Sequence, residues 1–276
     1  MTRKNPVLRF DMEIHPSPII SRERLEALYK RYNHRALIHP DPLEFLYDYP
    51  DPGDREVVGL IASSLAYGRV AQILKSVSSV LTRMQPSPFT FLINCSTKSL
   101  LTIFADFKHR FTTGEELAHM LWGAKGVIER YGSLQACFTA GLNDDDTILP
   151  ALSSFVKELN VEVSMGRNSL LPSPSRGSAC KRLNLFLRWM VRQDRVDPGG
   201  WRDVPLSKLI IPLDTHMQRI CSLLNLTTRK QADMRTAVEI THAFRQMVPE
   251  DPVRYDFALT RLGIRKDADL ASFLNG

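Results

Sequence analysis

Cysteine is scarce and dispersed in this 276-residue chain. The four cysteines, Cys95, Cys137, Cys180 and Cys221, form no CxxC pair and have no histidine at metal-ligand spacing. The sequence therefore predicts neither a zinc site nor an iron–sulfur cluster, and we expect buried, reduced thiols. No motif for an organic cofactor is present either, so we expect no metal and no cofactor.

Long hydrophobic runs are also missing. Charged residues interrupt every apolar run well before the roughly 18 residues that cross a bilayer. The N-terminal stretch MTRKNPVLRFDMEIHP lacks the apolar segment of a signal peptide. We therefore expect a cytoplasmic protein that does not bind membranes, with enough apolar residues, 43%, for a sizeable core.

Alternating strand patterns, internal repeats and low-complexity segments are absent as well, and helical periodicity dominates. The sequence thus predicts an all-α fold. We expect a basic N-terminal arm at residues 1–20 and a single unit at 21–276 made of two interleaved helical subdomains. A Pro/Ser-rich loop is predicted at about 161–175. The expected helices are one opened by Ser21, a long helix or a pair broken at Gly68 over 54–84, and helices at 113–131, 132–138, 147–160, 181–191, 215–224, 232–247 and 252–262.

Basic residues are concentrated in one segment. The chain has 36 basic and 30 acidic residues, and residues 176–195 hold six basic residues against one acid. In KRLNLFLRWMVR the apolar residues form one stripe, which leaves a polar stripe at helical spacing on the opposite side. The residues of that polar stripe are Lys181, Asn184, Arg188 and Arg192. It is either a solvated helix face or a surface that binds phosphates.

A turn precedes this helix in LLPSPSRGSACKRLN. Its Gly177 and the first backbone N–H groups of the helix could approach a phosphate closely, while Lys181 and Arg182 neutralise the charge.

Asp214, in IPLDTHMQRI, directly precedes another helical pattern. The carboxylate is expected to cap that helix, a role worth roughly 0.5–2 kcal/mol. Capping does not exclude chemistry, because a carboxylate held by helix N–H groups can also stabilise a developing cation. Asp214 and His216 could suggest a metal site, but no third ligand lies nearby in the sequence.

Together these segments resemble the helix-hairpin-helix DNA glycosylases, whose signature includes a Pro-Val-Asp-Thr-His-type segment with a catalytic aspartate. Asp214 falls on that aspartate, and Lys181, 33 residues before it, falls near the lysine of the bifunctional members. The spacing is similar to that of the archaeal 8-oxoguanine glycosylases. GSACKRLNLFLRWMVR, LIIPLDTHMQRI and DPVRYDFALTRLGI look like a bacterial family that is defined as a domain of unknown function.

The sequence departs from the glycosylase pattern in three places. SRGSACK replaces the usual Gly-x-Gly hairpin, IASSLAYGRV carries no glutamine pair, and the C-terminal four-cysteine cluster is absent. The last departure excludes endonuclease III and the adenine glycosylases of the clustered kind.

The resemblance implies a monomeric, nucleoid-associated base-excision repair glycosylase with AP-lyase activity, acting on damaged double-stranded DNA that carries an oxidised purine or another lesion. Asp214 would support the sugar cation and Lys181 would form a covalent imine. Gly177, Arg182, Arg188 and Arg192 would bind the DNA backbone, and Asn184 and His216 would orient the site. The candidates for the pocket of a flipped base are Tyr67, Trp122 and Trp189.

Two other functions remain open. One is a nucleic-acid binding protein of the same fold without turnover. The other is an all-α scaffold whose basic helix meets an acidic protein partner. Steep salt dependence would favour a nucleic acid over a protein partner.

Overall fold

The computed structural model describes residues 19–160, 168–264 and 273, and its regular structure is almost entirely helical. Two-residue strands, β1 (Lys108–His109) and β2 (Thr112–Thr113), pair antiparallel in a small hairpin. The all-α prediction is confirmed. The N-terminal arm and the first part of the predicted 161–175 loop fall mostly outside the described residues.

The helices agree with the periodicity of the sequence at most positions. The predicted pair broken at Gly68 is confirmed, because α2 and α3 are separate and Gly68 adopts φ +100° between them. Two short helices, α4 and α5, were not predicted. The α-helices are α1 (Arg22–Tyr32), α2 (Pro52–Ser64), α3 (Val70–Arg83), α4 (Pro88–Asn94), α5 (Thr97–Ile103), α6 (Gly114–Tyr131), α7 (Leu134–Ala140), α8 (Leu149–Leu159), α9 (Lys181–Val191), α10 (Thr215–Leu223), α11 (Met234–Met247) and α12 (Asp256–Ile264). The 3₁₀ helices are η1 (Arg35–Leu37), η2 (Pro42–Asp48), η3 (Pro174–Arg176) and η4 (Leu206–Lys208).

Short polar side chains begin many of these helices. Ser21 caps α1 as predicted, and Thr113 and Glu116 form a reciprocal capping box at the start of α6. Ser87 and Ser96 cap the two helices that were not predicted. Those helices have seven residues each, so their helical period gives only a weak signal in the sequence.

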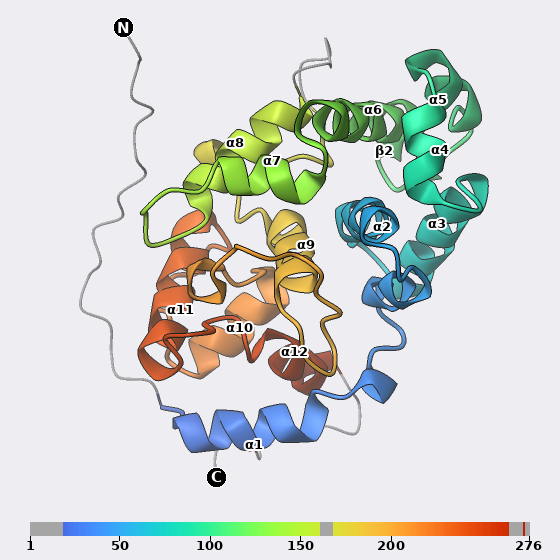
Figure 1. The fold of residues 1–276 in the computed structure, drawn as a ribbon. Coiled ribbons are helices and arrows are strands. Elements are labelled where there is room, and N and C mark those ends of the chain that lie inside the picture. The colour runs from blue at the N-terminus through green and yellow to red at the C-terminus, as the bar shows by residue number, and fades with distance from the viewer. Residues whose placement is uncertain (1–18, 161–167, 265–272, 274–276) are drawn as a thin grey trace, which may run out of the picture.

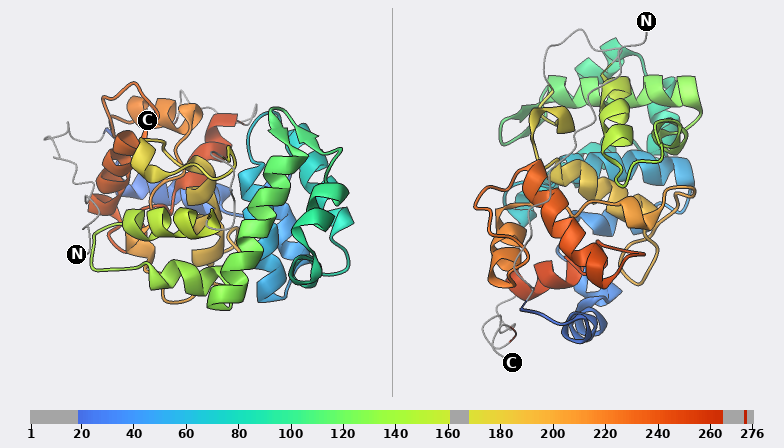
Figure 2. Two further views of the ribbon diagram at one scale, coloured as in Figure 1. Left: turned by 90° about the horizontal axis from the view of Figure 1, so that it is seen from above. Right: turned by 90° about the vertical axis from the view of Figure 1, so that its left-hand side faces the viewer.

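The helices form two groups. Helices α2 to α8 lie on one side, and α10, α11 and α12 lie on the other together with α1 from the opposite end of the chain (Figure 1). Helix α1 packs against α12, and α12 packs against α10. Figure 2 shows the same two groups from two further directions, with α9 between them. Helix α9 also packs closely against α2, so it is covered on both sides.

This central position buries α9 almost completely. Every residue from Leu183 to Val191 is buried, including Asn184 and Arg188. Phe186 forms an aromatic cluster with Trp201 and Phe155, and its ring lies 5.2 Å from the Trp201 ring at 87°. The predicted exposed polar stripe, whether solvated or phosphate-binding, is therefore wrong at Asn184, Arg188 and Arg192. Two groups of helices enclose α9, whereas its single apolar stripe indicated packing against one group only.

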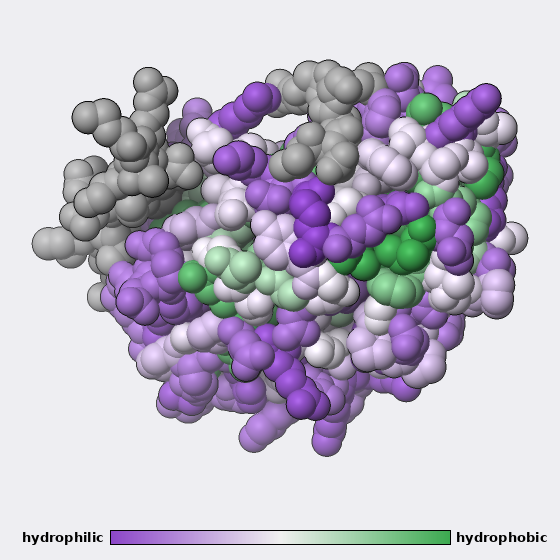
Figure 3. Space-filling model, turned by 45° about the horizontal axis from the view of Figure 1, so that its top comes forward, coloured by the Kyte–Doolittle hydropathy of each residue, from purple (hydrophilic) through white to green (hydrophobic). Residues whose placement is uncertain are grey.

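No helix within the described part of the chain is both long and apolar enough to cross a membrane. The face shown in Figure 3 is mostly hydrophilic, and its hydrophobic areas are small and separated by polar side chains.

Candidate functional site

The structure brings Lys181 and Asp214 together. Lys181 Nζ lies 3.7 Å from Asp214 Oδ2, and the side chains are 30% and 45% exposed. Lys181 is the first residue of α9 and Asp214 is the N-cap of α10, so two helix N-termini meet at this pair. Both side chains are open to solvent and could meet a ligand.

The two carboxylate oxygens of Asp214 have different partners: one caps α10 and the other faces Lys181. Its Oδ1 accepts hydrogen bonds from the backbone N–H groups of His216 at 3.0 Å and Met217 at 2.9 Å. The predicted cap is confirmed. Because Oδ1 is held in this way, Oδ2 is the oxygen turned toward Lys181, and the carboxylate cannot rotate without losing the cap.

A turn anchored to α11 places Lys181. Gly177 is exposed and adopts φ +78°, a left-handed conformation that favours glycine, and its carbonyl accepts a hydrogen bond from Met234 N at 3.1 Å. Cys180 also has a positive φ, +47°, and its N–H donates to Ser178 Oγ at 3.2 Å. Cys180 is the N-cap of α9, and within the described residues its side chain makes no capping hydrogen bond to the first N–H groups of this helix.

Arg182 follows Lys181 but turns away from the pair. Its Nη1 donates to the carbonyl of Ser64 at 2.8 Å and its Nη2 to that of Ser169 at 2.5 Å. Burial lowers the pKa of this guanidinium, and no carboxylate among the described residues is hydrogen bonded to it. Arg182 therefore joins the start of α9 to the end of α2, and it does not lie on the exposed surface that the predicted phosphate contact required.

The predicted DNA-backbone contacts of Arg188 and Arg192 are wrong. Both side chains are buried, 5% and 4% exposed, and both are bound by aspartates. Arg188 pairs with Asp197 at 3.1 Å and with Asp256. Burial lowers the pKa of the Arg188 guanidinium, but Asp197 and Asp256 outweigh it, so the net shift is upward. A phosphate could reach neither arginine without the opening of the core.

Arg192 is held even more tightly than Arg188. It pairs with Asp251 at 2.9 Å, with Asp194 at 2.8 Å and with Asp197. Burial lowers its pKa and these carboxylates raise it, with a net shift well upward. The sequence contained the acids but did not show which of them would meet the arginines.

Asn184 and His216, the two residues predicted to orient the site, each form a hydrogen bond that involves a backbone group. Asn184 is buried, its Nδ2 donates to the carbonyl of Ala179 at 3.0 Å, and its Oδ1 has no hydrogen-bond partner within the described residues. Asn184 therefore stabilises the turn that carries Lys181. His216 provides its N–H to Asp214, and its ring packs against Gly263, where an added Cβ would lie 2.3 Å from Nε2.

Of the three aromatic candidates, Tyr67 is the one connected to the start of α9. Its ring lies 5.0 Å from the Arg182 guanidinium. Trp189 is fully buried in the core, so its predicted place in a base pocket is wrong. Trp122 lies on α6, and its ring centre lies 5.4 Å from Lys125 Nζ.

The sequence reasoning missed Phe111 and Arg110 at the tip of the β1–β2 hairpin. Phe111 is 68% exposed, and its ring stacks on Tyr67 at 5.2 Å and 25°. The Arg110 guanidinium lies 5.5 Å from the Phe111 ring and 5.9 Å from the Tyr67 ring. An aromatic residue directly after a lysine, a histidine and an arginine in KHRFTT was the available signal, but it is a weak one until the exposure of the ring is known.

A buried polar cluster holds this hairpin in place. The hydroxyl of Tyr67 donates to the carbonyl of His109 at 2.8 Å, and His109 lies edge-on to Tyr67 at 4.7 Å. His109 Nε2 donates to the carbonyl of Tyr67 at 3.0 Å, so its Nδ1 accepts from the Ser76 hydroxyl at 2.9 Å. We name the group formed by the half-buried Tyr67 and the exposed Arg110 and Phe111 the hairpin platform.

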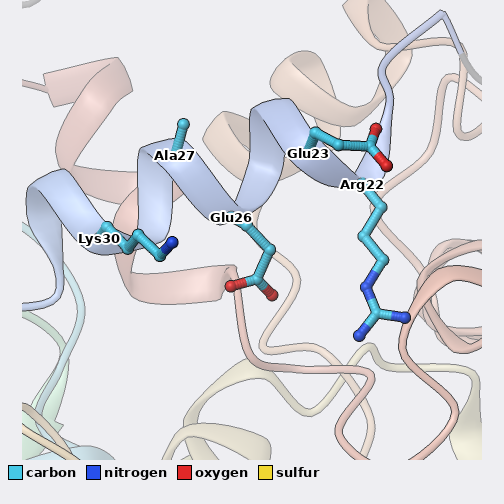
Figure 4. A pocket seen from close by; sticks show the side chains of 5 residues that line it. All are labelled: Arg22, Glu23, Glu26, Ala27 and Lys30. Atoms are coloured by element: carbon cyan, nitrogen blue, oxygen red, sulfur yellow. The ribbon is translucent and has the colours of Figure 1, made fainter.

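An open pocket elsewhere on the surface does not belong to this site. Its lining side chains all come from α1, as Figure 4 shows: Arg22, Glu23, Glu26, Ala27 and Lys30. Glu26 already accepts hydrogen bonds from Arg254 at 2.9 Å and from Tyr255 at 2.8 Å. None of these residues contacts the Lys181–Asp214 pair.

Comparison with known proteins assigns the chain to a family but not to an activity. The family model described as "Protein of unknown function (DUF2400)" matches residues 41–265. No curated protein and no solved structure matched significantly. The matched region includes the hairpin platform, the buried arginines and both members of the Lys181–Asp214 pair. The predicted relation to a family of unknown function is confirmed, and the chain belongs to the DUF2400 family.

Proposed function

We propose that this protein is a DNA glycosylase with AP-lyase activity that removes a damaged base in base-excision repair. The observation that carries the proposal is the 3.7 Å approach of Lys181 Nζ to the free oxygen of a carboxylate that caps a helix. A nucleophile and a proton acceptor lie in one exposed place, and the acceptor is fixed by backbone N–H groups.

The reaction begins when the base leaves the stack and enters the site, which costs a few kcal/mol. As the bond between C1′ and the base nitrogen breaks, the base takes the electron pair and positive charge builds on the sugar. Asp214 stabilises that charge more than it stabilises the neutral ground state.

Lys181 then completes the covalent step. Asp214 accepts a proton from Nζ, and the Nζ electron pair forms a bond to C1′. The bond from C1′ to the ring oxygen breaks, that oxygen takes a proton, and a protonated imine forms. Loss of a proton from C2′ expels the 3′ phosphate and cleaves the strand, which is the lyase step.

The hairpin platform supports a nucleic-acid substrate. An exposed aromatic ring with an arginine over it is suited to stack against a base, and such stacking contributes about 1–3 kcal/mol per base. Because Tyr67 also contacts Arg182, which follows Lys181, the platform is linked through packed side chains to the start of α9. Phe111 would then occupy the space that a flipped base leaves in the duplex.

Exposed basic residues take over the role first given to Arg188 and Arg192. Arg110 lies on the platform, and Arg176 directly precedes Gly177 in the turn; both are exposed. We therefore expect the double variant Arg110→Ala, Arg176→Ala to reduce the salt dependence of duplex binding by about two phosphate contacts, or roughly 1.8 in log–log slope. Arg195→Ala is the matched control, because Arg195 is exposed but lies beyond the other end of α9.

The catalytic proposal is tested by borohydride trapping. Duplexes that carry an oxidised purine or an abasic site should give a covalent protein–DNA adduct, which Lys181→Gln should abolish while duplex binding is retained. Lys230→Gln, at another exposed lysine, should leave the adduct unchanged. Asp214→Asn should slow adduct formation severely and still cap α10. An adduct that survives Lys181→Gln would refute this assignment.

A non-catalytic nucleic-acid binding protein is the second candidate, and the exposed hairpin platform is the observation that favours it. This second candidate predicts duplex binding that depends on Phe111 and Arg110, with no adduct on any lesion.

As an enzyme, the protein would act as a monomer on chromosomal DNA in the cytoplasm. Sedimentation of the protein with and without duplex tests the stoichiometry.

A further inference from the structure

Arg182 lies where the hairpin platform meets the start of α9. Its Cζ lies 5.0 Å from the centre of the Tyr67 ring, and Phe111 stacks on the same ring at 5.2 Å and 25°. Arg182 directly follows Lys181, the first residue of α9. A single side chain, that of Tyr67, therefore connects the exposed ring of the platform with the residue next to the proposed nucleophile.

Two hydrogen bonds fix the direction of the Arg182 side chain. Nη1 donates to the carbonyl of Ser64, the last residue of α2, and Nη2 donates to the carbonyl of Ser169. These two carbonyls belong to separate segments of the chain, and the planar guanidinium spans both of them. Rotation of the guanidinium away from Tyr67 would therefore break at least one of these hydrogen bonds.

Ser169 leads back to the hairpin by a second route. Its N–H donates to Glu116 Oε1 at 3.1 Å, and the other carboxylate oxygen of Glu116 accepts from the N–H of Thr113 at 3.1 Å. Thr113 is the second residue of strand β2. Arg182 is thus connected to the hairpin through Tyr67 on one side and through Ser169 and Glu116 on the other.

The route through Tyr67 is also fixed at its hairpin end. The Tyr67 hydroxyl donates to the carbonyl of His109 in β1 at 2.8 Å and lies 2.6 Å from Thr112 Oγ1 in β2. The ring that Arg182 contacts is therefore bound to both strands. With both routes in place, we expect the hairpin and the start of α9 to behave as one rigid unit.

We propose that Arg182 is a positioning residue of this site, which holds the start of α9 in a fixed position relative to the hairpin platform. Its use in catalysis rests on the proposed function. When Phe111 takes the place of the flipped base, this fixed position brings C1′ of the same nucleotide to Lys181 Nζ. Such alignment matters, because a displacement of about 1 Å can slow a reaction roughly 100-fold.

This role requires an arginine and not merely a cation. A lysine would keep the positive charge and could still lie against Tyr67. Its single ammonium group lacks the planar fork that spans the carbonyls of Ser64 and Ser169. Arg182→Lys therefore removes the connection and leaves the net charge beside the site unchanged.

The connection itself is tested without DNA, by amide hydrogen exchange in the intact protein. In Arg182→Lys we expect exchange to become faster by about threefold or more in the hairpin, residues 107–113, as well as in the first turn of α9. Faster exchange in α9 alone would overturn the proposal.

Arg130→Lys is the matched control for this measurement. Arg130 also donates to a backbone carbonyl, that of Glu158, but it does so at the C-terminal ends of α6 and α8. Its substitution should leave exchange unchanged both in the hairpin and at the start of α9. An effect equal to that of Arg182→Lys would show general loosening of the fold and would also overturn the proposal.

A perturbation from the hairpin side covers the case that Arg182→Lys does not fold. Tyr67 is half-buried, and Tyr67→Leu removes the ring between Arg182 and Phe111. Within the described residues, the Tyr67 hydroxyl is bound to hairpin atoms. Faster exchange in the first turn of α9 would thus report the lost contact with Arg182, whereas faster exchange in the hairpin alone would overturn the proposal.

The catalytic use of the contact is tested by single-turnover borohydride trapping. Arg182→Lys should slow adduct formation by about 10- to 100-fold and leave duplex affinity unchanged, because the substrate still binds but is out of line. Phe111→Ala should slow the parent more than it slows Arg182→Lys, since both substitutions act on the same alignment. Effects that simply multiply would indicate a merely structural arginine and would overturn the positioning role.

The two proposals can fail separately. Absence of an adduct on every lesion, together with exchange that changes in the hairpin and in α9 at once, would refute the glycosylase assignment and support the connection through Arg182. Adducts that form equally fast in the parent and in Arg182→Lys, with hairpin exchange unchanged, would do the reverse.

Discussion

Arg192→Ala should destabilise this protein strongly, because Arg192 is a buried ionic contact and not a surface cation. Its guanidinium donates to both oxygens of Asp251 at 2.9–3.1 Å, to Asp194 at 2.8 Å and to Asp197. The substitution would leave three carboxylates, and among the described residues Arg188 remains as a buried cation for Asp197 but not for Asp194 or Asp251. Removal of one partner from a buried ion pair costs about 3–5 kcal/mol, mostly because the remaining charge stays desolvated.

Equilibrium unfolding in urea measures this loss directly. In thermal unfolding, each kcal/mol of lost stability lowers the Tm of a large domain by roughly 2–4 °C, so Tm should fall by about 6–20 °C. Arg195→Ala is the matched control, since Arg195 is exposed, and its effect should stay within about 0.5 kcal/mol. A loss below about 1 kcal/mol for Arg192→Ala would refute the description of this arginine as a buried structural group.

Three further predictions concern stability. Burial raises the pKa of Asp194, but Arg192 and the N–H groups of Asp197 and Val196 outweigh this effect and bring the pKa to about 2. The ordinary pKa of an aspartate is about 3.9, so the lowered pKa should contribute about 2 kcal/mol to folding stability above pH 4. This contribution should be lost as the pH falls through 2. Asp194→Asn should therefore lower the free energy of unfolding at pH 7 much more than at pH 2.5, and an equal loss at both would contradict the pKa assignment. Burial, together with Arg110 and Arg182, lowers the pKa of His109. The contribution of neutral His109 to folding stability is therefore complete above the ordinary histidine pKa near 6.5, and it is lost as the pH falls through the lowered pKa of the folded state. The drop in Tm from pH 7.5 to pH 5 should be smaller in His109→Gln, and a drop as steep as in the parent would exclude His109 as its source. In Gly123→Ala the new Cβ would lie 1.9 Å from the carbonyl oxygen of Leu159, so α6 and α8 must separate at a cost of about 1–3 kcal/mol; unchanged urea unfolding would show that these helices do not meet at Gly123.

The sequence by itself determined the local structure. Helical periodicity indicated the all-α class, and α9 occupies the predicted residues 181–191 because its apolar spacing continues without a break. The cap at Asp214 was also predictable, since an N-cap depends on a few neighbouring residues. Short helices with little more than a serine to mark their start, such as α4 and α5, gave too little periodicity to be recognised.

Only the tertiary structure decided which charges face solvent. Arg188 and Arg192 occupy a polar stripe that is typical of an exposed face, but helices from both ends of the chain enclose α9. Aspartates from α12 and from the loops after α9 and α11 neutralise the two arginines. Burial is a property of the assembled fold, so one helix pattern could not reveal it. The same holds for the meeting of Lys181 with Asp214 and for the exposure of Phe111. Periodicity is set within a few residues of chain, whereas these contacts join residues far apart in the sequence, and their positions are fixed only when the helices pack.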